Sequence, residues 1–154
     1  MADYFENGYP PPAFSFRVTI GTASGSADTS FTDVSGIALE MDTETVVEGG
    51  ENRFVHHLPT QRKHPHLELK RGIASLKSPL LRWCKAVLEG GLGQPIVTET
   101  VIVHLLDEKQ LPLRTWELSD AWPIKWEVEG FSSSKNEVAV EKIVLAYTCA
   151  TRTK

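Results

Sequence analysis

Hydrophobic and polar residues alternate along much of the chain, the pattern of β-strands that bury one face. Alternating runs span residues 14–20, 37–44, 66–70 and 122–128. Longer apolar runs at 96–105 and 113–118 are also expected to form strands. The run 138–149 is apolar on both faces, which predicts a central strand covered on both sides. The pattern therefore predicts a mainly β, antiparallel fold built as a two-sheet barrel or sandwich.

One segment changes from a period of two to a helical period. Ser78 is a suitable N-cap, and Pro79 can occupy the first helical position. Apolar residues then recur on one helical face at Leu80, Leu81, Cys84, Val87 and Leu88. Gly90-Gly91 supplies a stop. These signals predict one α-helix over about 79–89 that flanks the sheets of a single domain, residues 1–154.

Two stretches are expected to lie outside the core. Residues 21–30 are small and polar, which indicates a loop. Residues 40–58 are expected to form a long hairpin, because Gly49-Gly50 is a turn signal between the run that ends near Glu44 and a returning strand at 54–58. The polar character of its tip predicts that this hairpin projects.

Composition excludes several classes of protein. The chain has 154 residues, with 16 basic and 20 acidic side chains, so its formal net charge is −4. No basic stripe is visible, which argues against a dedicated nucleic-acid binder. No apolar run approaches the roughly 18–20 residues that span a bilayer, so stable membrane insertion is not expected. Residues 1–7 lack the features of a signal peptide, which predicts synthesis in the cytoplasm. Cys84 and Cys149 are expected to be buried, reduced thiols.

Four histidines lie within 11 residues, at His56, His57, His64 and His66. Such a cluster could bind zinc or another transition metal. Adjacent residues on a strand point to opposite faces, however, so His56 and His57 cannot serve one site. We therefore expect polar surface residues here and no metal site.

No catalytic constellation is apparent, so the chain is expected to be non-enzymatic and without a cofactor. A Gly-x-Ser-x-Gly nucleophile elbow is absent, and the glycines at 21–25 have no P-loop lysine. Glu40, Asp42 and Glu44 share a strand face, which indicates a solvated acidic surface. The four tryptophans favour core packing or a protein interface; they are Trp83, Trp116, Trp122 and Trp126.

A series of short motifs runs along the chain in order. They are Phe31-x-Asp33-Val34-Ser35-Gly36-Ile37, Glu40-x-x-x-Glu44, Glu48-Gly49-Gly50-x-Asn52, Leu58-Pro59-Thr60, Leu67-x-Leu69-Lys70-Arg71-Gly72-Ile73, Ser78-Pro79-Leu80-x-x-Trp83, Leu105-Leu106-Asp107-Glu108, Trp116, Ala121-Trp122-Pro123-Ile124-Lys125-Trp126 and Asn136-Glu137-Val138-Ala139-Val140-Glu141. Together they resemble the tail tube protein family of contractile phages and related contractile injection systems. The resemblance covers nearly the whole chain, from about Phe14 to about Tyr147.

The resemblance implies a non-enzymatic structural subunit of an inner tube. Six copies would form a ring, and rings would stack into a rigid hollow tube inside a contractile sheath, with a baseplate at its end. DNA, an effector or another cargo would pass through the lumen. The particle would be a phage tail or a phage tail-like particle released from the cell. The chain could equally be the tube-initiator paralogue that forms the first ring on the baseplate; a metal- or small-ligand-binding barrel is the remaining alternative.

The same resemblance gives the acidic hairpin two expected roles. It would bridge neighbouring subunits or rings, with the assembly residues Glu40, Asp42, Glu44, Glu48, Gly49, Gly50 and Asn52. Some acids are also expected to face the lumen, with Glu40, Asp42, Glu44 and Glu99 as the candidates. An anionic wall would repel DNA phosphates and limit their sticking during passage.

Overall fold

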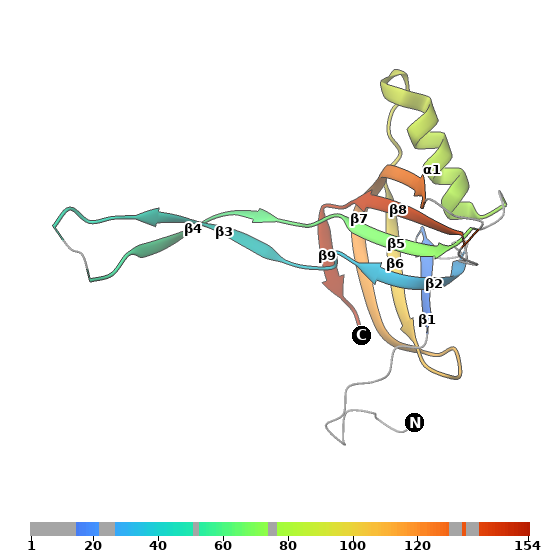
Figure 1. Ribbon diagram of the computed structural model, residues 1–154, viewed down its shortest axis with the longest axis horizontal. Helices are drawn as coiled ribbons and strands as arrows, with labels where there is room; N and C mark the ends of the chain where they lie inside the picture. Colours follow the sequence, from blue (N-terminus) through green and yellow to red (C-terminus); the bar gives the residue numbers. More distant parts are fainter. Residues whose placement is uncertain (1–14, 22–26, 51–52, 74–76, 130–133, 135–138) are drawn as a thin grey trace.

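The computed structural model shows a small flattened barrel from which a long hairpin projects, with a helix packed at one end (Figure 1). The structure describes residues 15–21, 27–50, 53–73, 77–129, 134 and 139–154. The barrel strands are β1 (Ser15–Ile20), β2 (Ala27–Ser35), β5 (Leu67–Gly72), β6 (Glu99–Leu106), β7 (Pro112–Val128), β8 (Val140–Ala146) and β9 (Cys149–Arg152). The hairpin is β3 (Glu40–Val46) and β4 (His56–Lys63), and the helices are α1 (Pro79–Gly90) and the 3-10 turn η1 (Gly91–Gly93).

The barrel is one seven-stranded antiparallel sheet in the order β6-β1-β2-β5-β8-β7-β9. A further pairing between β6 and β7 closes this order on itself, so the sheet folds over into two layers. The predicted fold class, mainly β and antiparallel with one flanking α-helix, is confirmed. The helix begins at Pro79 as expected, and the Ser78 hydroxyl accepts a hydrogen bond from the Leu81 amide at 3.3 Å.

Strand β7 explains how a single sheet supplies both layers. It is 17 residues long; its first half pairs with β6 and its second half with β8. The change of partner occurs near Asp120, which has a positive φ of 52°. The two strands expected at 113–118 and 122–128 are therefore one bent strand, because the backbone ladder passes from one neighbour to the next without a break.

Strand β2 corrects the loop expected at 21–30. Ala27–Ser30 belong to β2, since Ala27, Asp28 and Thr29 pair with residues of β1. Small polar composition indicated a loop there, but the β1 ladder fixes these residues as a strand. Residues 22–26 lie outside the described part of the chain.

The last predicted strand is also divided. The expected strand at 138–149 is divided into β8 and β9, and its residue 138 lies outside the described part of the chain. The predicted central position of β8 is confirmed, because it lies between β5 and β7, but Val140, Lys142 and Ala146 on it are only half-buried. A break at Tyr147–Thr148 separates β8 from β9, and the Thr148 amide donates to the Ser119 carbonyl at 3.0 Å. Cys84 is buried as expected, but Cys149 at the start of β9 is exposed, because β9 covers β7 only and no strand of the described chain covers β9.

The core lies inside the barrel and under the buried face of the helix. Its fully buried members come from both layers and from α1: Val18, Leu67, Leu69, Leu80, Cys84, Val101, Val103, Leu118, Ala121, Ile143 and Leu145. Burial of apolar area of this kind is the main favourable contribution to folding.

A buried ion pair joins the helix end of the barrel to its sheet. Arg71 on β5 and Glu141 on β8 are 3% and 1% exposed, and Arg71 Nε donates to Glu141 Oε1 at 2.6 Å. Arg71 Nη2 also donates to the Ser78 hydroxyl at 2.8 Å, while Trp126 Nε1 donates to Glu141 Oε2 at 3.2 Å. The same Ser78 oxygen caps α1. The pair thus fixes the start of the helix against β5, β7 and β8.

Replacing Glu141 with Leu is expected to destabilise the fold by about 3–5 kcal/mol, because it leaves the Arg71 guanidinium buried without its carboxylate. The loss can be measured as a lower midpoint of urea unfolding at unchanged slope. The exposed helix pair Lys85–Glu89, at 3.7 Å, is the control. Glu89→Ala should cost only about 0.3–0.5 kcal/mol. Equal losses in the two variants would contradict the structural role of the buried pair.

Candidate functional site

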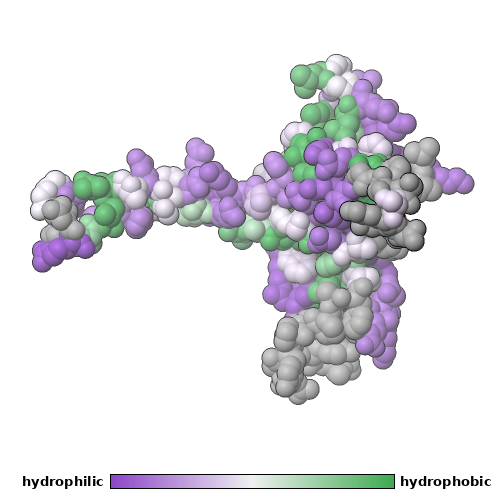
Figure 2. All heavy atoms as spheres, in the orientation of Figure 1, coloured by the Kyte–Doolittle hydropathy of each residue, from purple (hydrophilic) through white to green (hydrophobic). Residues whose placement is uncertain are grey.

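The projecting hairpin exposes large hydrophobic side chains along its whole length. They are Leu39 (71% exposed), Met41 (51%), Val46 (40%), Val47 (69%), Phe54 (53%), Val55 (48%) and Leu58 (50%). Figure 2 shows hydrophobic surface at the far end of the hairpin and again near its root, with hydrophilic residues between them. An isolated two-stranded hairpin is marginally stable at best in water. This surface therefore requires a partner.

The hairpin is longer than the segment expected at 40–58. Its ladder runs from the Val46–His56 pair near the tip to the Glu40–Lys63 pair at the root, so β4 continues five residues past Leu58. The pattern missed this part because residues 59–63 carry no apolar alternation. Their strand conformation comes from pairing with β3.

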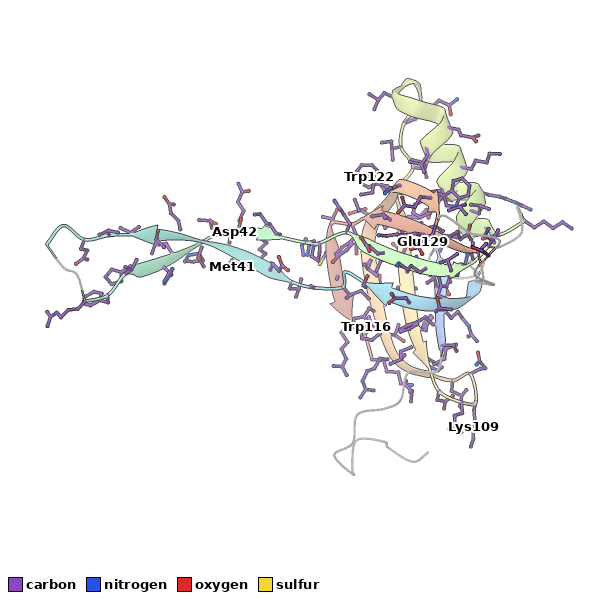
Figure 3. All side chains as sticks on the ribbon, in the orientation of Figure 1. Met41, Asp42, Lys109, Trp116, Trp122 and Glu129 are labelled. Atoms are coloured by element: carbon purple, nitrogen blue, oxygen red, sulfur yellow. The ribbon has the colours of Figure 1, made fainter. Side chains whose placement is uncertain are left out.

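Cross-strand register places Glu44 and Val46 of β3 on one face of the hairpin, beyond an irregularity in the ladder between Met41 and Thr43. Glu44 pairs with Leu58 and Val46 with His56, and paired residues lie on the same side of a ribbon. Asp42 forms an ion pair with Lys63, whereas the carboxylates of Glu40 and Glu44 have no ion-pair partner among the described residues. Figure 3 shows Met41 and Asp42 on the inner half of the hairpin. The face that carries Glu44, Val46, His56 and Leu58, with Phe54 whose ring centroid lies 5.2 Å from that of His56, is called the Glu44 face below.

The tip contains the remaining predicted assembly residues. Glu48 Oε1 lies 3.6 Å from His56 Nε2, so the two side chains form an ion pair when the histidine is protonated. Gly50 has a φ of +96°, which a turn at this point requires. Gly49 is exposed, and Asn52 lies outside the described residues.

The root of the hairpin is a close crossing of two backbone segments. Gly36 has a φ of +89°, and a Cβ atom at this position would lie 1.9 Å from the carbonyl oxygen of His66. Tyr147, just after β8, donates its hydroxyl to the Gly36 carbonyl at 2.8 Å and also lies 3.4 Å from the Ala38 carbonyl. These contacts fix the direction in which the hairpin leaves the barrel.

The structure separates the histidines as well. His56 and His57 are exposed and pair with Val46 and Thr45, so they point to opposite faces. His64 lies at the root with its ring centroid 5.4 Å from that of Tyr147, and its Nδ1 is buried with no hydrogen-bond partner among the described atoms. Within the described ranges, no group of three or more His, Cys, Asp or Glu side chains is placed to hold a metal ion.

A hydrophobic cavity of about 230 Å³ opens beside the same root. Its lining comes from β1, β2, the two residues after β2, β6 and β7: Phe16, Val34, Ser35, Gly36, Ile37, Val103 and Trp116. Figure 3 places Trp116 in the lower half of the barrel, near β9. Trp116 pairs with Arg152 on β9, and β9 pairs with β7 alone. The cavity thus lies beside the open edge of the sheet.

The fourth predicted lumen acid is remote from the other three. Glu99 is the first residue of β6 and pairs with Ala121, in the barrel, whereas Glu40, Asp42 and Glu44 lie on the hairpin. The four acids form no single cluster within one chain. In the part of the chain that is described, no helix has the length and apolar character needed to cross a membrane.

The sequence matches the family model described as "T4-like virus tail tube protein gp19" over residues 12–151, nearly the whole chain. The chain belongs to this tail tube family. This finding confirms the resemblance seen in the sequence motifs. The family consists of structural tube proteins, and the long exposed hairpin is in keeping with a protein that functions through contacts with other copies.

Solved structures of contractile injection systems contain similar chains. A chain of the anti-feeding prophage baseplate, reconstructed with 6-fold symmetry, has 26% sequence identity and a TM-score of 0.75, with 94% of this chain and 96% of that chain covered. A chain of the cap that terminates the anti-feeding prophage tube has 26% identity and a TM-score of 0.74, covering 95% and 92% of the two chains.

The fold also extends to more distant proteins. A chain of the PVC sheath-tube complex in the extended state has 23% identity and a TM-score of 0.76, with 99% and 97% of the two chains covered. Hcp1 from Flavobacterium johnsoniae shares the fold at 13% identity and a TM-score of 0.58, with 91% and 95% covered. The curated proteins contain no significant match to the chain.

Several residues of the site were not predicted from sequence. Tyr147 and His66 meet Gly36 only through the tertiary fold, and no spacing along the chain indicates this. The exposure of Val47, Phe54 and Val55 was also missed. A signal for it exists, because the adjacent pairs Val46-Val47 and Phe54-Val55 break the alternation of apolar and polar residues that a half-buried strand shows.

Replacing Gly36 with Ala should destabilise the protein by at least about 2 kcal/mol. Left-handed backbone costs a non-glycine residue roughly 1–2 kcal/mol, and the clash with the His66 carbonyl adds to that cost. Gly49→Ala is the matched control, because open space surrounds Gly49. Urea unfolding of the two variants measures the difference. An unchanged midpoint for Gly36→Ala would show that the root is not constrained as described.

Alkaline pH should weaken the root through Tyr147. Burial raises the pKa of its hydroxyl above the ordinary value near 10, and the Glu40 carboxylate adds to this. Above pH 10 the unfolded chain therefore loses the proton first, so the free energy of unfolding falls as pH rises. Unfolding midpoints between pH 9 and 11 should fall less steeply in Tyr147→Phe than in the native protein. Parallel curves would contradict this assignment.

Proposed function

We propose that the protein is the repeating inner-tube subunit of a contractile injection system, and that six copies form each ring of a stacked tube. The observation that carries the proposal is the hairpin: it exposes hydrophobic side chains on both faces, in a chain of the tail tube family. Assembly would cover these side chains. Sheath and baseplate subunits are the proposed partners outside the tube and at its end, and a cargo molecule is the proposed occupant of the lumen.

The 6-fold symmetry of the anti-feeding prophage baseplate supports rings of six. A heterologous contact between identical copies closes into a ring when its rotation permits, and otherwise produces a filament. In the proposed tube the hairpin makes the ring-closing contact between neighbouring subunits, or it contributes to the contact between stacked rings. A purely structural role without catalysis, and a route in which the protein is made in the cytoplasm and released within the particle, complete the proposal.

Light scattering and negative-stain microscopy of the purified protein test this function directly. Rings of six subunits, or hollow tubes built from them, are the expected result. A monomer at all concentrations up to those used for microscopy would contradict the proposal. Rings that never stack, but bind to baseplate proteins, would favour the initiator paralogue.

Replacing Gly49 and Gly50 together with Val is expected to impair assembly more than folding. The tip is exposed, and Gly50 alone requires a positive φ, so the strain is confined to the tip while the barrel core is untouched. Light scattering should show loss of rings, with near-native circular dichroism of the monomer. Loss of the folded monomer itself would argue against a role for the tip in assembly.

The acidic lumen is proposed for Glu40, Asp42 and Glu99, with Glu44 treated separately below. Its support is the small number of local partners: Asp42 has Lys63, whereas Glu40 has no ion-pair partner among the described residues. A reconstruction of the tube in which these carboxylates lie at the outer surface would overturn this part of the proposal.

A further inference from the structure

The hydrophobic cavity beside the hairpin root has the composition of a docking site. Two aromatic rings, Phe16 and Trp116, and the aliphatic side chains of Val34, Ile37 and Val103 line it. Val103 is fully buried and the other four are partly buried against the barrel core, so the cavity is an apolar recess where the core opens at the hairpin root. A partner for this cavity must present hydrophobic side chains.

Two arginines share the face of the sheet that bears Trp116. Arg152 is its cross-strand partner on β9, and Arg114 lies two residues before it on β7, so all three side chains are on one side. Arg152 Nε donates to the Lys154 carbonyl at 3.0 Å, and no carboxylate of the described chain forms an ion pair with Arg152. The site thus combines a hydrophobic cavity with cationic side chains beside it.

The Glu44 face of the hairpin has the complementary composition. Its hydrophobic members Val46, Phe54 and Leu58 are 40–53% exposed, and Glu44 pairs directly across from Leu58. Directly paired residues have Cβ atoms roughly 4.5–5.5 Å apart. Each surface therefore places a charged side chain directly across from a hydrophobic one: Glu44 across from Leu58, and Arg152 across from Trp116.

The hairpin cannot fill the cavity of its own chain. Gly36 and Ile37 line the cavity and also begin the hairpin, which then leads away from the barrel (Figure 1). About ten residues from Glu40 to the tip, at roughly 3.3 Å each, give a reach of about 33 Å. A domain of about 100 residues has a radius of gyration of about 13 Å, so the hairpin can extend across a neighbouring barrel.

On these grounds we infer that the Glu44 face of one copy docks on the cavity of another, with Glu44 of the first copy paired to Arg152 of the second. The inference rests on the proposed function, because it names the surface on which the assembly hairpin acts. It places Glu44 in an interface between subunits and not in the lumen wall.

Charge reversal tests the pairing. Glu44→Arg and Arg152→Glu, each alone, should raise the concentration needed for half-maximal ring assembly by at least about tenfold, since like charges then meet at each contact. The double variant restores opposite charges and should assemble within about threefold of the native protein. Glu89→Arg and Arg82→Glu change the same charges on exposed positions of α1 and serve as controls. Light scattering measures assembly, and circular dichroism confirms that each variant folds.

Mixing the two single variants gives a second test that needs no new protein. In a ring of alternating copies, the arginine introduced by Glu44→Arg in one subunit would meet the glutamate introduced by Arg152→Glu in the next. The native Glu44 of that second subunit would then meet the native Arg152 of the following one. A ring of six can alternate without a mismatch, so the mixture should form rings that neither variant forms alone.

The outcomes separate this inference from the proposed function. Assembly of the native protein and of both controls, with single variants that also assemble normally, would overturn the docking inference and leave the tube subunit intact. Single variants that fail, with neither the double variant nor the mixture restoring rings, would likewise overturn the pairing of Glu44 with Arg152. Absence of rings in the native protein would overturn both.

Discussion

A two-stranded ribbon has two faces and no interior, and this constraint governs the whole molecule. The hairpin cannot bury Val47 and Phe54, which lie just beyond the ends of β3 and β4, because no third element of the described chain covers them. Their hydrophobic area becomes favourable only when a second chain removes it from water. The barrel can therefore be understood as a rigid base for the hairpin. Gly36, packed against the His66 carbonyl, and the Tyr147 hydroxyl fix the hairpin's direction. Without such a base, the ordering of a long ribbon would cost conformational entropy at the moment of assembly.

At the opposite end of the barrel, a buried polar network satisfies one of the first backbone amides of the helix. Helix α1 begins over the sheet, where its first amides need acceptors. Ser78 accepts one of them and also accepts a hydrogen bond from Arg71, whose charge Glu141 neutralises. Replacing a buried ion pair with hydrophobic residues is often neutral or stabilising, so stability alone does not explain its presence. A network that must satisfy β5, β7, β8 and α1 together does fix one orientation of the helix. The buried Arg71–Glu141 pair is therefore better explained by its effect on the orientation of the helix than by its effect on stability.

Local signals predicted those elements whose causes are local. Ser78-Pro79 and the helical spacing after it placed α1, and apolar character on both faces placed β8 between two neighbours. The errors share a different cause. Ala27–Ser30 are a strand because β1 offers a ladder, and β7 runs through Asp120 because β8 takes over where β6 ends. Pairing between distant strands carries no signature in either sequence alone. Tyr147 was missed for the same reason, since its function depends on a carbonyl more than a hundred residues away, at Gly36.

The net charge of −4 conceals an uneven distribution that matters for assembly. Acids gather on β3, while Arg114 and Arg152 lie beside the cavity at the open sheet edge, so one chain carries both halves of a complementary pair of surfaces. Complementary patches at different places on one molecule produce a head-to-tail contact, which either closes into a ring or continues as a filament. The hairpin root determines whether a ring or a filament forms, because the direction in which the hairpin leaves the barrel sets the rotation from one copy to the next. A small error in that direction would be repeated at every contact around a ring. This geometric demand explains why the root, rather than the exposed tip, contains the tightest backbone packing of the hairpin.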